Sequence, residues 1–319
     1  MNNPKLITST SPKNLLFWLA SVGTITFIAL VQWLVDWRGV FQAWQNVAWQ
    51  ALFIAATFVA ASYAARVWRL MDFFPNTLSH HPKRATHLAL LDHFFNQFGL
   101  PRQANNAFAA MMHRVSGIAY AESQSATLWF RLLDWHTLLC FLIYPLLVIT
   151  PFRRLAVIVI ALWLLIPLVI YATRHILQRR FLGDDTNLGI LAQQTLSGLP
   201  DNFIAFLKSW GITWLIWGAY LLGLAWFLRQ LMPDHSFNVL ILALVAGELA
   251  LFIPLRSLFN MPLYEVGVVF ALFGFIGWQA ALVHALNLHL FSLAAALIAG
   301  SIAWLFSDKT QQPSMMTKI

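Results

Sequence analysis

The sequence predicts an all-α fold, a polytopic bundle of about eight transmembrane helices with two broken or re-entrant segments. Of the 319 residues, 60% are hydrophobic and only 10% are charged, and the mean hydropathy is +0.68. A soluble domain carries about 25% charged residues, so a soluble fold could not hide this much apolar surface. The apolar residues also gather in runs of about 20, the length that a helix needs to cross a bilayer.

The expected spans follow directly from these runs. They cover 14–35, 47–68, 125–149, 153–171, 208–229, 238–254, 264–283 and 286–306. The first run is too long for the core of a signal peptide and is not followed by a small-residue cleavage site, so we expect a retained membrane helix. The last two runs are almost continuous, and we expect them to form a tight hairpin or to lie partly buried.

The distribution of basic residues predicts the orientation. With eight spans and a cytoplasmic N-terminus, 15 of the 20 Lys and Arg residues fall on the cytoplasmic side and four on the other side, and Arg131 lies within a span. Such a bias is typical of cytoplasmic loops. We therefore expect both termini in the cytoplasm. The formal net charge of +8 is explained by this topology, and we expect no nucleic-acid partner.

We expect a single integral membrane domain over 1–319, with 13 N-terminal and 12 C-terminal residues as short cytoplasmic tails and no soluble catalytic domain. The one cysteine, Cys140, excludes an intramolecular disulfide and a cysteine metal cluster. The sequence contains no HExxH, Walker A or GxSxG motif, and its histidines lack metal-ligand spacing. We expect no metal, no cofactor and a transporter-like protein rather than an enzyme.

Two segments combine Pro, Arg and Asn within an apolar context, namely 92–106 (DHFFNQFGLPRQANN) and 252–267 (FIPLRSLFNMPLYEVG). Non-helical backbone at membrane depth is tolerated only where it lines a cavity or is buried in protein. A pair of broken segments in the two halves of a chain is also a pointer to the binding site of a transporter. We expect the two segments to form one polar cavity. Its candidate binding residues are Asn96, Arg102, Asn105, Asn106, Arg256 and Glu265.

Charged residues within spans are costly and indicate function or a specific partner. Arg131 and Asp134 are three residues apart, hence on one helix face, and we expect them to form an ion pair. This pair could serve helix packing or a transport pathway, and the sequence leaves both open. Glu248 is a lone carboxylate within the sixth run. It must face a partner, water or the bundle interior.

The connector 187–207 is amphipathic and is interrupted by Gly198 and Pro200. Together with the preceding RHILQRRF (174–181), it is predicted to lie on the cytoplasmic membrane surface. Its arginines would either anchor the topology or contact anionic headgroups.

Three motifs in order resemble the membrane domain of the lysylphosphatidylglycerol synthase type, often called flippase-like. They are Asn96 with Leu100-Pro101-Arg102, then HRVSGI (113–118), then ATLWFRLLDWHTL (126–138). The resemblance extends to FIPLRSLFNMPLYEVGVVFALFGF (252–275), where Glu265 opens a helix, and to SYAARVWRLMDFF (62–74). It follows the span order over most of the chain, and its specific part covers about 80 residues.

The resemblance implies two re-entrant hairpins in a bundle that moves a lipid or lipid-linked molecule between leaflets of the bacterial inner membrane. Arg102 would then hold a phosphate or carboxylate. Asn105 and Asn106 stand where the family has Gly-Glu, which favours a less charged cavity or a different substrate. The expected partners are membrane lipids, and a homo-oligomer stays open.

Two alternatives also remain open. The chain could be a non-catalytic membrane partner of a lipid or envelope-glycan biosynthetic enzyme, because the first segment lacks the acidic member of the family pattern. It could also be a membrane-embedded transferase that uses Mg²⁺. The only adjacent acidic pair for that role is Asp184–Asp185, which we expect instead to cap the helix that begins near Thr186.

Overall fold

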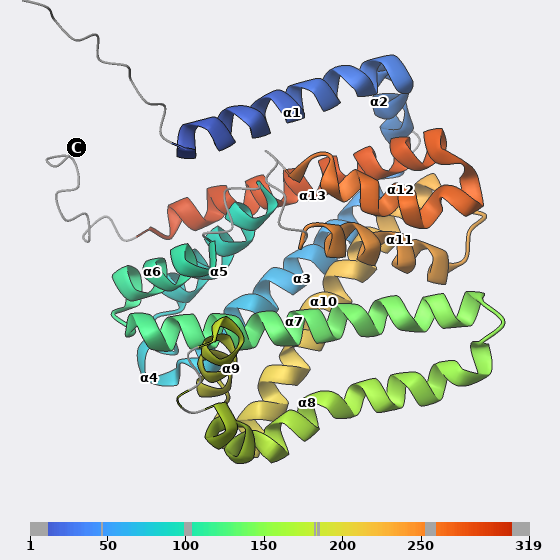
Figure 1. The fold of residues 1–319 in the computed structure, drawn as a ribbon. Coiled ribbons are helices and arrows are strands. Elements are labelled where there is room, and N and C mark those ends of the chain that lie inside the picture. The colour runs from blue at the N-terminus through green and yellow to red at the C-terminus, as the bar shows by residue number, and fades with distance from the viewer. Residues whose placement is uncertain are drawn as a thin grey trace, which may run out of the picture.

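The structure is a computed structural model that describes residues 12–45, 47–98, 104–181, 183, 186–252 and 260–307, without the side chains of 12–20 and 104–106. Every regular element in this part of the chain is a helix (Figure 1). The helices are α1 (Pro12–Leu34), α2 (Trp37–Gln45), α3 (Trp49–Phe73), α4 (Pro75–Leu78), α5 (Pro82–Gln97), α6 (Ala104–Ser116), α7 (Tyr120–Ile149), α8 (Arg153–Phe181), α9 (Asn187–Ser197), α10 (Phe203–Leu231), α11 (Phe237–Ala250), α12 (Leu263–Ile276) and α13 (Trp278–Leu305).

Five of these helices, α3, α7, α8, α10 and α13, are long and apolar enough to cross a membrane. The prediction of an all-helical, multi-pass membrane protein is therefore confirmed at this level, whereas the count of eight spans is not. Three further apolar helices are shorter within the described side chains, namely Ser21–Leu34, α11 and α12. The two predicted tails lie almost wholly outside the described residues.

The boundary predicted between the last two runs is wrong. Gly277 adopts φ +76° and separates α12 from α13. A glycine has no Cβ to oppose this conformation, so the chain can turn there at little cost. The predicted run 264–283 is thus divided between two helices. The 14 residues of α12 extend about 21 Å, well short of the ~30 Å hydrocarbon core.

Two pairs of short helices accompany the long ones. The first pair is α5 with α6, and the second is α11 with α12; the members of each pair pack against each other. Figure 1 shows the first pair toward one end of α7 and the second pair toward its other end. These four helices are 16, 13, 14 and 14 residues long, shorter than the ~20 residues that a bilayer needs.

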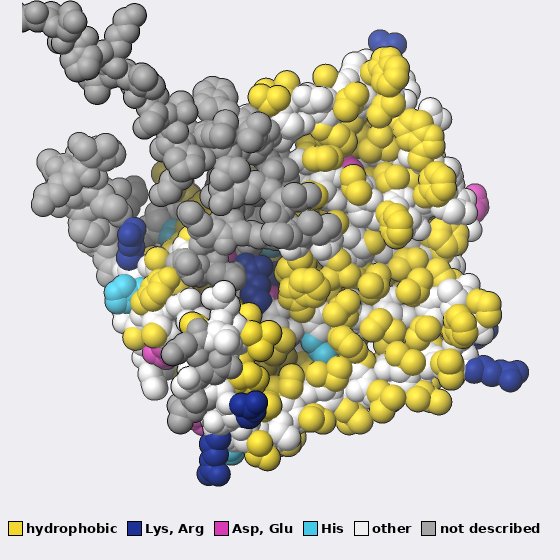
Figure 2. All heavy atoms as spheres, in the orientation of Figure 1, with side chains coloured by type: hydrophobic (Ala, Val, Ile, Leu, Met, Phe, Trp, Pro, Cys, Tyr) yellow, Lys and Arg dark blue, Asp and Glu magenta, His cyan; other side chains and the backbone are white. Residues whose placement is uncertain are grey.

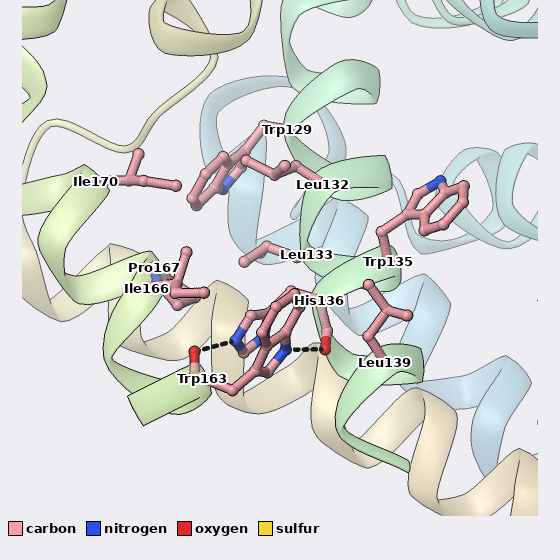
Figure 3. Close-up of a pocket in the computed structure, with 10 residues that line it drawn as sticks. All are labelled: Trp129, Leu132, Leu133, Trp135, His136, Leu139, Trp163, Ile166, Pro167 and Ile170. Carbon is pink, nitrogen blue, oxygen red and sulfur yellow. Dashed lines mark hydrogen bonds between the residues drawn. The ribbon is translucent and has the colours of Figure 1, made fainter. Parts of the chain in front are cut away.

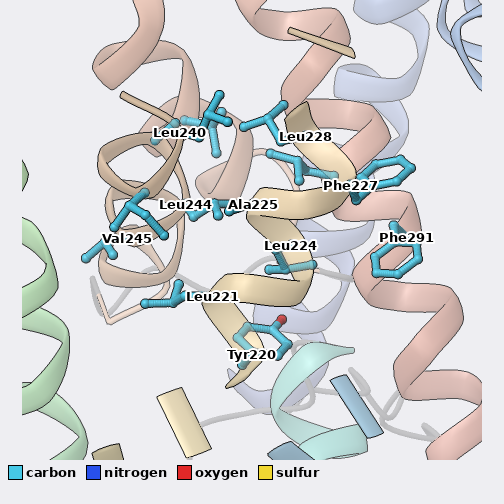
Figure 4. Close-up of a cluster of buried hydrophobic side chains, with 14 of the residues drawn as sticks. Tyr220, Leu221, Leu224, Ala225, Phe227, Leu228, Leu240, Leu244, Val245 and Phe291 are labelled. Atoms are coloured by element: carbon cyan, nitrogen blue, oxygen red, sulfur yellow. The ribbon is translucent and has the colours of Figure 1, made fainter. Parts of the chain in front are cut away.

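The main apolar core surrounds α10, which packs most extensively against α3. Figure 4 shows how α10 side chains interleave with α11 and α13, where the rings of Phe227 and Phe291 stack with centroids 4.7 Å apart. In the most apolar stretch of 18 residues in each helix, 67% of the α10 stretch is buried inside the structure, but only 17% of the α8 stretch. The central position of α10 lets it contribute polar side chains to the interior, whereas α8 lies at the periphery.

The outer surface is suited to lipid contact. Large hydrophobic side chains of α8 are widely exposed, among them Val157 at 73% and Leu162 at 62%. Figure 2 shows hydrophobic side chains over much of one face, with most basic side chains near its margins. Exposed apolar surface on this scale marks an interaction with a membrane or another protein.

Helices α11 and α12 approach each other closely because glycines lie between them. A Cβ added at Gly267 would lie 2.4 Å from the backbone carbonyl oxygen of Ala246. At Gly247, an added Cβ would meet the ring of Tyr264 at 2.8 Å. These contacts bring the carboxylates of the neighbouring Glu248 and Glu265 into the same part of the interior.

Gly267→Ala should therefore destabilise the protein by about 1–3 kcal/mol, because the new methyl group would meet backbone that cannot move aside. Thermal unfolding in detergent micelles measures this change. Gly274→Ala on the same helix is the matched control, since nothing lies within 4 Å of its added Cβ. Equal melting temperatures for the two variants would contradict the close packing of α11 on α12.

Candidate functional site

A buried ion pair lies where α3, α7 and α10 meet. The Arg69 guanidinium donates to Asp134 Oδ1 at 2.8 Å, and both side chains are only 9% exposed. The same oxygen accepts the indole N–H of Trp217 at 2.9 Å, while Arg69 also donates to the Thr213 hydroxyl at 3.2 Å. The Arg69 guanidinium lies over the ring of Phe130, 4.5 Å from its centroid. Asp134 is therefore satisfied by side chains from two other helices.

The predicted pairing of Asp134 with Arg131 is wrong. Arg131 instead donates to the side-chain carbonyl of Asn96 on α5 at 3.1 Å. The two residues do lie on one side of α7, but Asp134 faces α3 and α10 whereas Arg131 faces α5. The spacing of three residues indicates only that Arg131 and Asp134 share a helix face. It cannot show that Arg69, on α3, lies closer to Asp134.

Asp92 on α5 joins this pair into a larger group of charges. It interacts electrostatically with Arg131, Arg66, Arg69 and Asp134. We call these five side chains the polar centre. It holds three guanidinium groups and two carboxylates, and among the described residues only Arg69 and Asp134 form a close ion pair within it.

Arg66 is the member of the polar centre that has a buried donor without a partner among the described residues. It is half-buried, its guanidinium lies 5.4 Å from the ring centroid of Trp217, and its Nε is buried without a hydrogen-bond partner in the described structure. A buried donor of a charged group without a partner is costly. This donor is therefore available to a ligand or to water.

The two broken segments meet at the end of α5. The Asn260 side-chain amide donates to the backbone carbonyls of Asn96 at 2.8 Å and of Gln97 at 3.0 Å. The last carbonyls of a helix lack partners within the helix, so this amide acts as a cap supplied by a distant segment. Asn260 has φ +58°, a conformation that asparagine tolerates better than most residues.

A chain of polar side chains leads from α5 across α10 to α13. Gln97 donates to the Tyr220 hydroxyl at 3.2 Å, which in turn donates to the Ser292 hydroxyl at 3.5 Å. His93 lies beside this chain, with its ring 4.8 Å from that of Tyr63 and 6.0 Å from that of Tyr220. Polar groups thus continue through the interior beyond the polar centre.

The predicted carboxylates Glu248 and Glu265 are both buried, at 5% and 1% exposure. Glu265 Oε1 lies 2.7 Å from Nδ1 of His289 on α13. Glu248 has an Oε1 without a hydrogen-bond partner in the described structure, and it interacts electrostatically with Arg66. Glu265 therefore belongs to the interior, and Glu248 connects α11 to the polar centre.

The remaining predicted residues are not placed by the structure. Arg102 and Arg256 lie outside the described residues. Asn105 and Asn106 lie in the first turn of α6, but their side chains are not described. Asp184 and Asp185 also lie outside, and Thr186 is the residue that caps α9, through a hydrogen bond from Gly189 N–H.

Sequence reasoning missed the role of Arg66, Arg69 and His289. Both arginines count among the basic residues that the sequence places on the cytoplasmic side, whereas α3 continues to Phe73 and carries them into the bundle. Their spacing of three residues on an extended helical pattern could have indicated this. His289 lies on a different helix from Glu265, so no spacing rule could have paired them.

A separate groove of about 180 Å³ lies between α7 and α8 (Figure 3). It is apolar and aromatic. His136 Nε2 lies 3.0 Å from the Trp163 carbonyl, and the Trp163 indole donates to the His136 carbonyl at 3.1 Å, whereas His136 Nδ1 and Trp129 Nε1 have no hydrogen-bond partner in the described structure. The groove therefore suits a hydrocarbon chain better than a charged group.

Comparison of the chain with family models, with curated proteins and with solved structures found no match. The resemblance to the flippase-like membrane domain consequently remains an expectation from the sequence.

Arg69→Ala should lower the free energy of unfolding by about 3–5 kcal/mol, because it leaves the Asp134 carboxylate buried without its cation. Lys208→Ala is the control, since Lys208 pairs with Asp72 at a site where its side chain is 52% exposed and such pairs contribute about 0–1 kcal/mol. Thermal unfolding in micelles compares the two. An equal loss in both variants would contradict a structural role for the buried pair.

Proposed function

We propose that this protein binds an anionic lipid or lipid-linked molecule by its headgroup and moves it between the leaflets of a membrane. The observation that carries the proposal is the half-buried Arg66, whose Nε has no hydrogen-bond partner within the described structure. The polar centre holds one more guanidinium than carboxylate, and an uncompensated charge in an apolar interior is costly. An anionic ligand would neutralise it.

The chemistry of arginine favours a phosphate or a carboxylate. Its planar guanidinium can bind either group through two parallel hydrogen bonds. Arg131, which donates to Asn96, would act as a second donor from the opposite side of the site. Arg102 and Arg256 would add to the same positive field if their segments line the cavity.

The surroundings suit a molecule that is part headgroup and part hydrocarbon. The headgroup would occupy the polar centre, and the acyl or prenyl chains would stay against the exposed apolar surface. The two pairs of short helices, joined through Asn260, would provide the headgroup with a route through the bundle. Paired short segments that end inside a bundle are a recurrent feature of transporters.

The proposed location is the bacterial inner membrane, with both termini in the cytoplasm. It rests on the resemblance and on the excess of basic residues in the segments assigned to the cytoplasmic side. Cysteine accessibility at the two termini would test the orientation.

Arg66→Gln should reduce lipid movement about tenfold or more, because a charge-assisted hydrogen bond to the headgroup is lost. The protein would be reconstituted into vesicles with a fluorescent phosphatidylglycerol, and the fraction accessible to an impermeant quencher would be followed over time. Unlike Arg69→Ala, this variant should keep the wild-type melting temperature, since Arg66 forms no close ion pair among the described residues.

The control is Arg229→Gln, which removes an exposed arginine in the last turn of α10. Equal transport by wild type and Arg66→Gln would contradict the assignment of Arg66. No lipid movement by the wild-type protein, together with its co-purification with a lipid or glycan biosynthetic enzyme, would instead favour the non-catalytic partner role.

A further inference from the structure

Three titratable side chains lie together in the part of the interior built by α11, α12 and α13. Glu265 and His289 are 1% and 0% exposed at their side chains and are 2.7 Å apart. Glu248 is 5% exposed and interacts electrostatically with His289. We call Glu248, Glu265 and His289 the proton cluster.

Each member of the proton cluster has a buried polar atom without a hydrogen-bond partner in the described structure. These atoms are Glu248 Oε1, Glu265 Oε2 and His289 Nε2. The hydroxyl of Tyr264, whose ring lies 4.8 Å from that of His289, is also without one. Native interiors rarely leave so many adjacent polar atoms unpaired, so the arrangement indicates exchangeable protons or water.

Because Glu248 and Glu265 lie in the same buried region, ionising both carboxylates at once is energetically costly. Glu265 has a histidine partner at hydrogen-bond distance, whereas Glu248 has the Tyr220 hydroxyl as a hydrogen-bond partner and keeps one carboxylate oxygen, Oε1, without any among the described residues. A carboxylate that is buried away from water and only partly hydrogen-bonded is more stable as the neutral acid, unless a nearby cation holds its charge. Protonation therefore depends on which charges face Glu248.

Several helices present titratable groups to this region. From α3 come Tyr63 and Arg66, from α5 His93, from α10 Tyr220 and from α12 Tyr264. On the α7 side, Asp134 is already bonded to Arg69 and Trp217. Among these groups, Arg66 is the fixed positive charge that interacts with Glu248. It is also the residue to which we assign the headgroup.

The charges around Arg66 therefore change with one proton. With Glu248 ionised, three arginines face three carboxylates, Asp92, Asp134 and Glu248, and their formal charges cancel. With Glu248 neutral, one positive charge is left over. An anionic headgroup would bind more tightly in the second state than in the first.

We propose that the proton cluster takes up one proton from water and that this uptake strengthens the hold of the polar centre on an anionic headgroup. The inference rests on the proposed function and deepens it, because it names how binding is coupled to a second ion. The coupling is reciprocal: if protonation favours the headgroup, binding of the headgroup favours protonation. A proton gradient could then bias the direction of movement.

The proton site can be tested without any lipid transport. Infrared difference spectra of the purified wild-type protein, recorded between about pH 5 and pH 9, should show the carbonyl stretch of a protonated carboxyl group that disappears as pH rises. Glu248→Gln should remove that band. Glu122→Gln, which changes an exposed carboxylate at the start of α7, should leave it unchanged.

The coupling is tested by calorimetry with short-chain phosphatidylglycerol in detergent. Binding to wild type should tighten by about five- to a hundredfold as pH falls through the infrared transition. Titrations in two buffers of different ionisation enthalpy should report uptake of up to about one proton. Glu248→Gln, which mimics the protonated state, should bind at high pH as tightly as wild type does at low pH, without proton uptake.

Each outcome decides one of the two claims. Absence of a titrating carboxyl band in the wild type overturns the proton site, whether or not Glu248→Gln folds. Binding with the same affinity at every pH overturns the coupling and leaves the proposed function intact. A titrating band together with no binding of the lipid at any pH supports the proton site, overturns its coupling to this headgroup, and counts against an anionic lipid as the substrate.

Discussion

Burial of the Asp134 carboxylate is the constraint on which the arrangement of the central helices depends. A carboxylate away from water must be paired and hydrogen-bonded, and Asp134 takes its cation from α3 and an indole N–H from α10. This requirement fixes three helices against one another. Because Arg69 is bound to Asp134, Arg66 and Arg131 are not paired with this carboxylate. The polar centre therefore consists of this pair together with Arg66, Arg131 and Asp92.

The interior contains two kinds of charge with different properties. Near α7, Arg69 and Asp134 form a close ion pair that joins two helices. On α11, α12 and α13, Glu248, Glu265 and His289 form the cluster for which we propose an exchangeable proton. Arg66 lies between the two groups, because it interacts with Asp92 and Asp134 on one side and with Glu248 on the other. A change of charge at Glu248 therefore alters the electrostatic environment of Arg66, and through Arg66 that of Asp92 and Asp134.

The helices could be predicted from the sequence because the thickness of a bilayer sets the length of an apolar run. The same reasoning failed at Gly277, where an apolar run continues through a break that depends on backbone conformation alone. It also counted Arg66 and Arg69 with the basic residues of the cytoplasmic side, because they lie at the end of the predicted run 47–68. The structure instead extends α3 through both residues.

The candidate site could be predicted only in outline. Asn96, Glu248, Glu265 and Asp134 were chosen because polar residues in an apolar context need partners, and the structure places all four in the interior. Their partners could not be predicted, since spacing along a helix indicates a shared face but not the neighbouring helix. The pairing of Glu265 with His289 depends on how α12 and α13 turn at Gly277, which no local pattern contains.

The contact made by Asn260 has a consequence for how the protein is assembled. The amide that caps the end of α5 belongs to a residue 164 positions after Asn96 in the chain. These two carbonyls can take their final partner only after Asn260 has been synthesised. A truncated chain that ends before Asn260 would therefore lack this cap on α5.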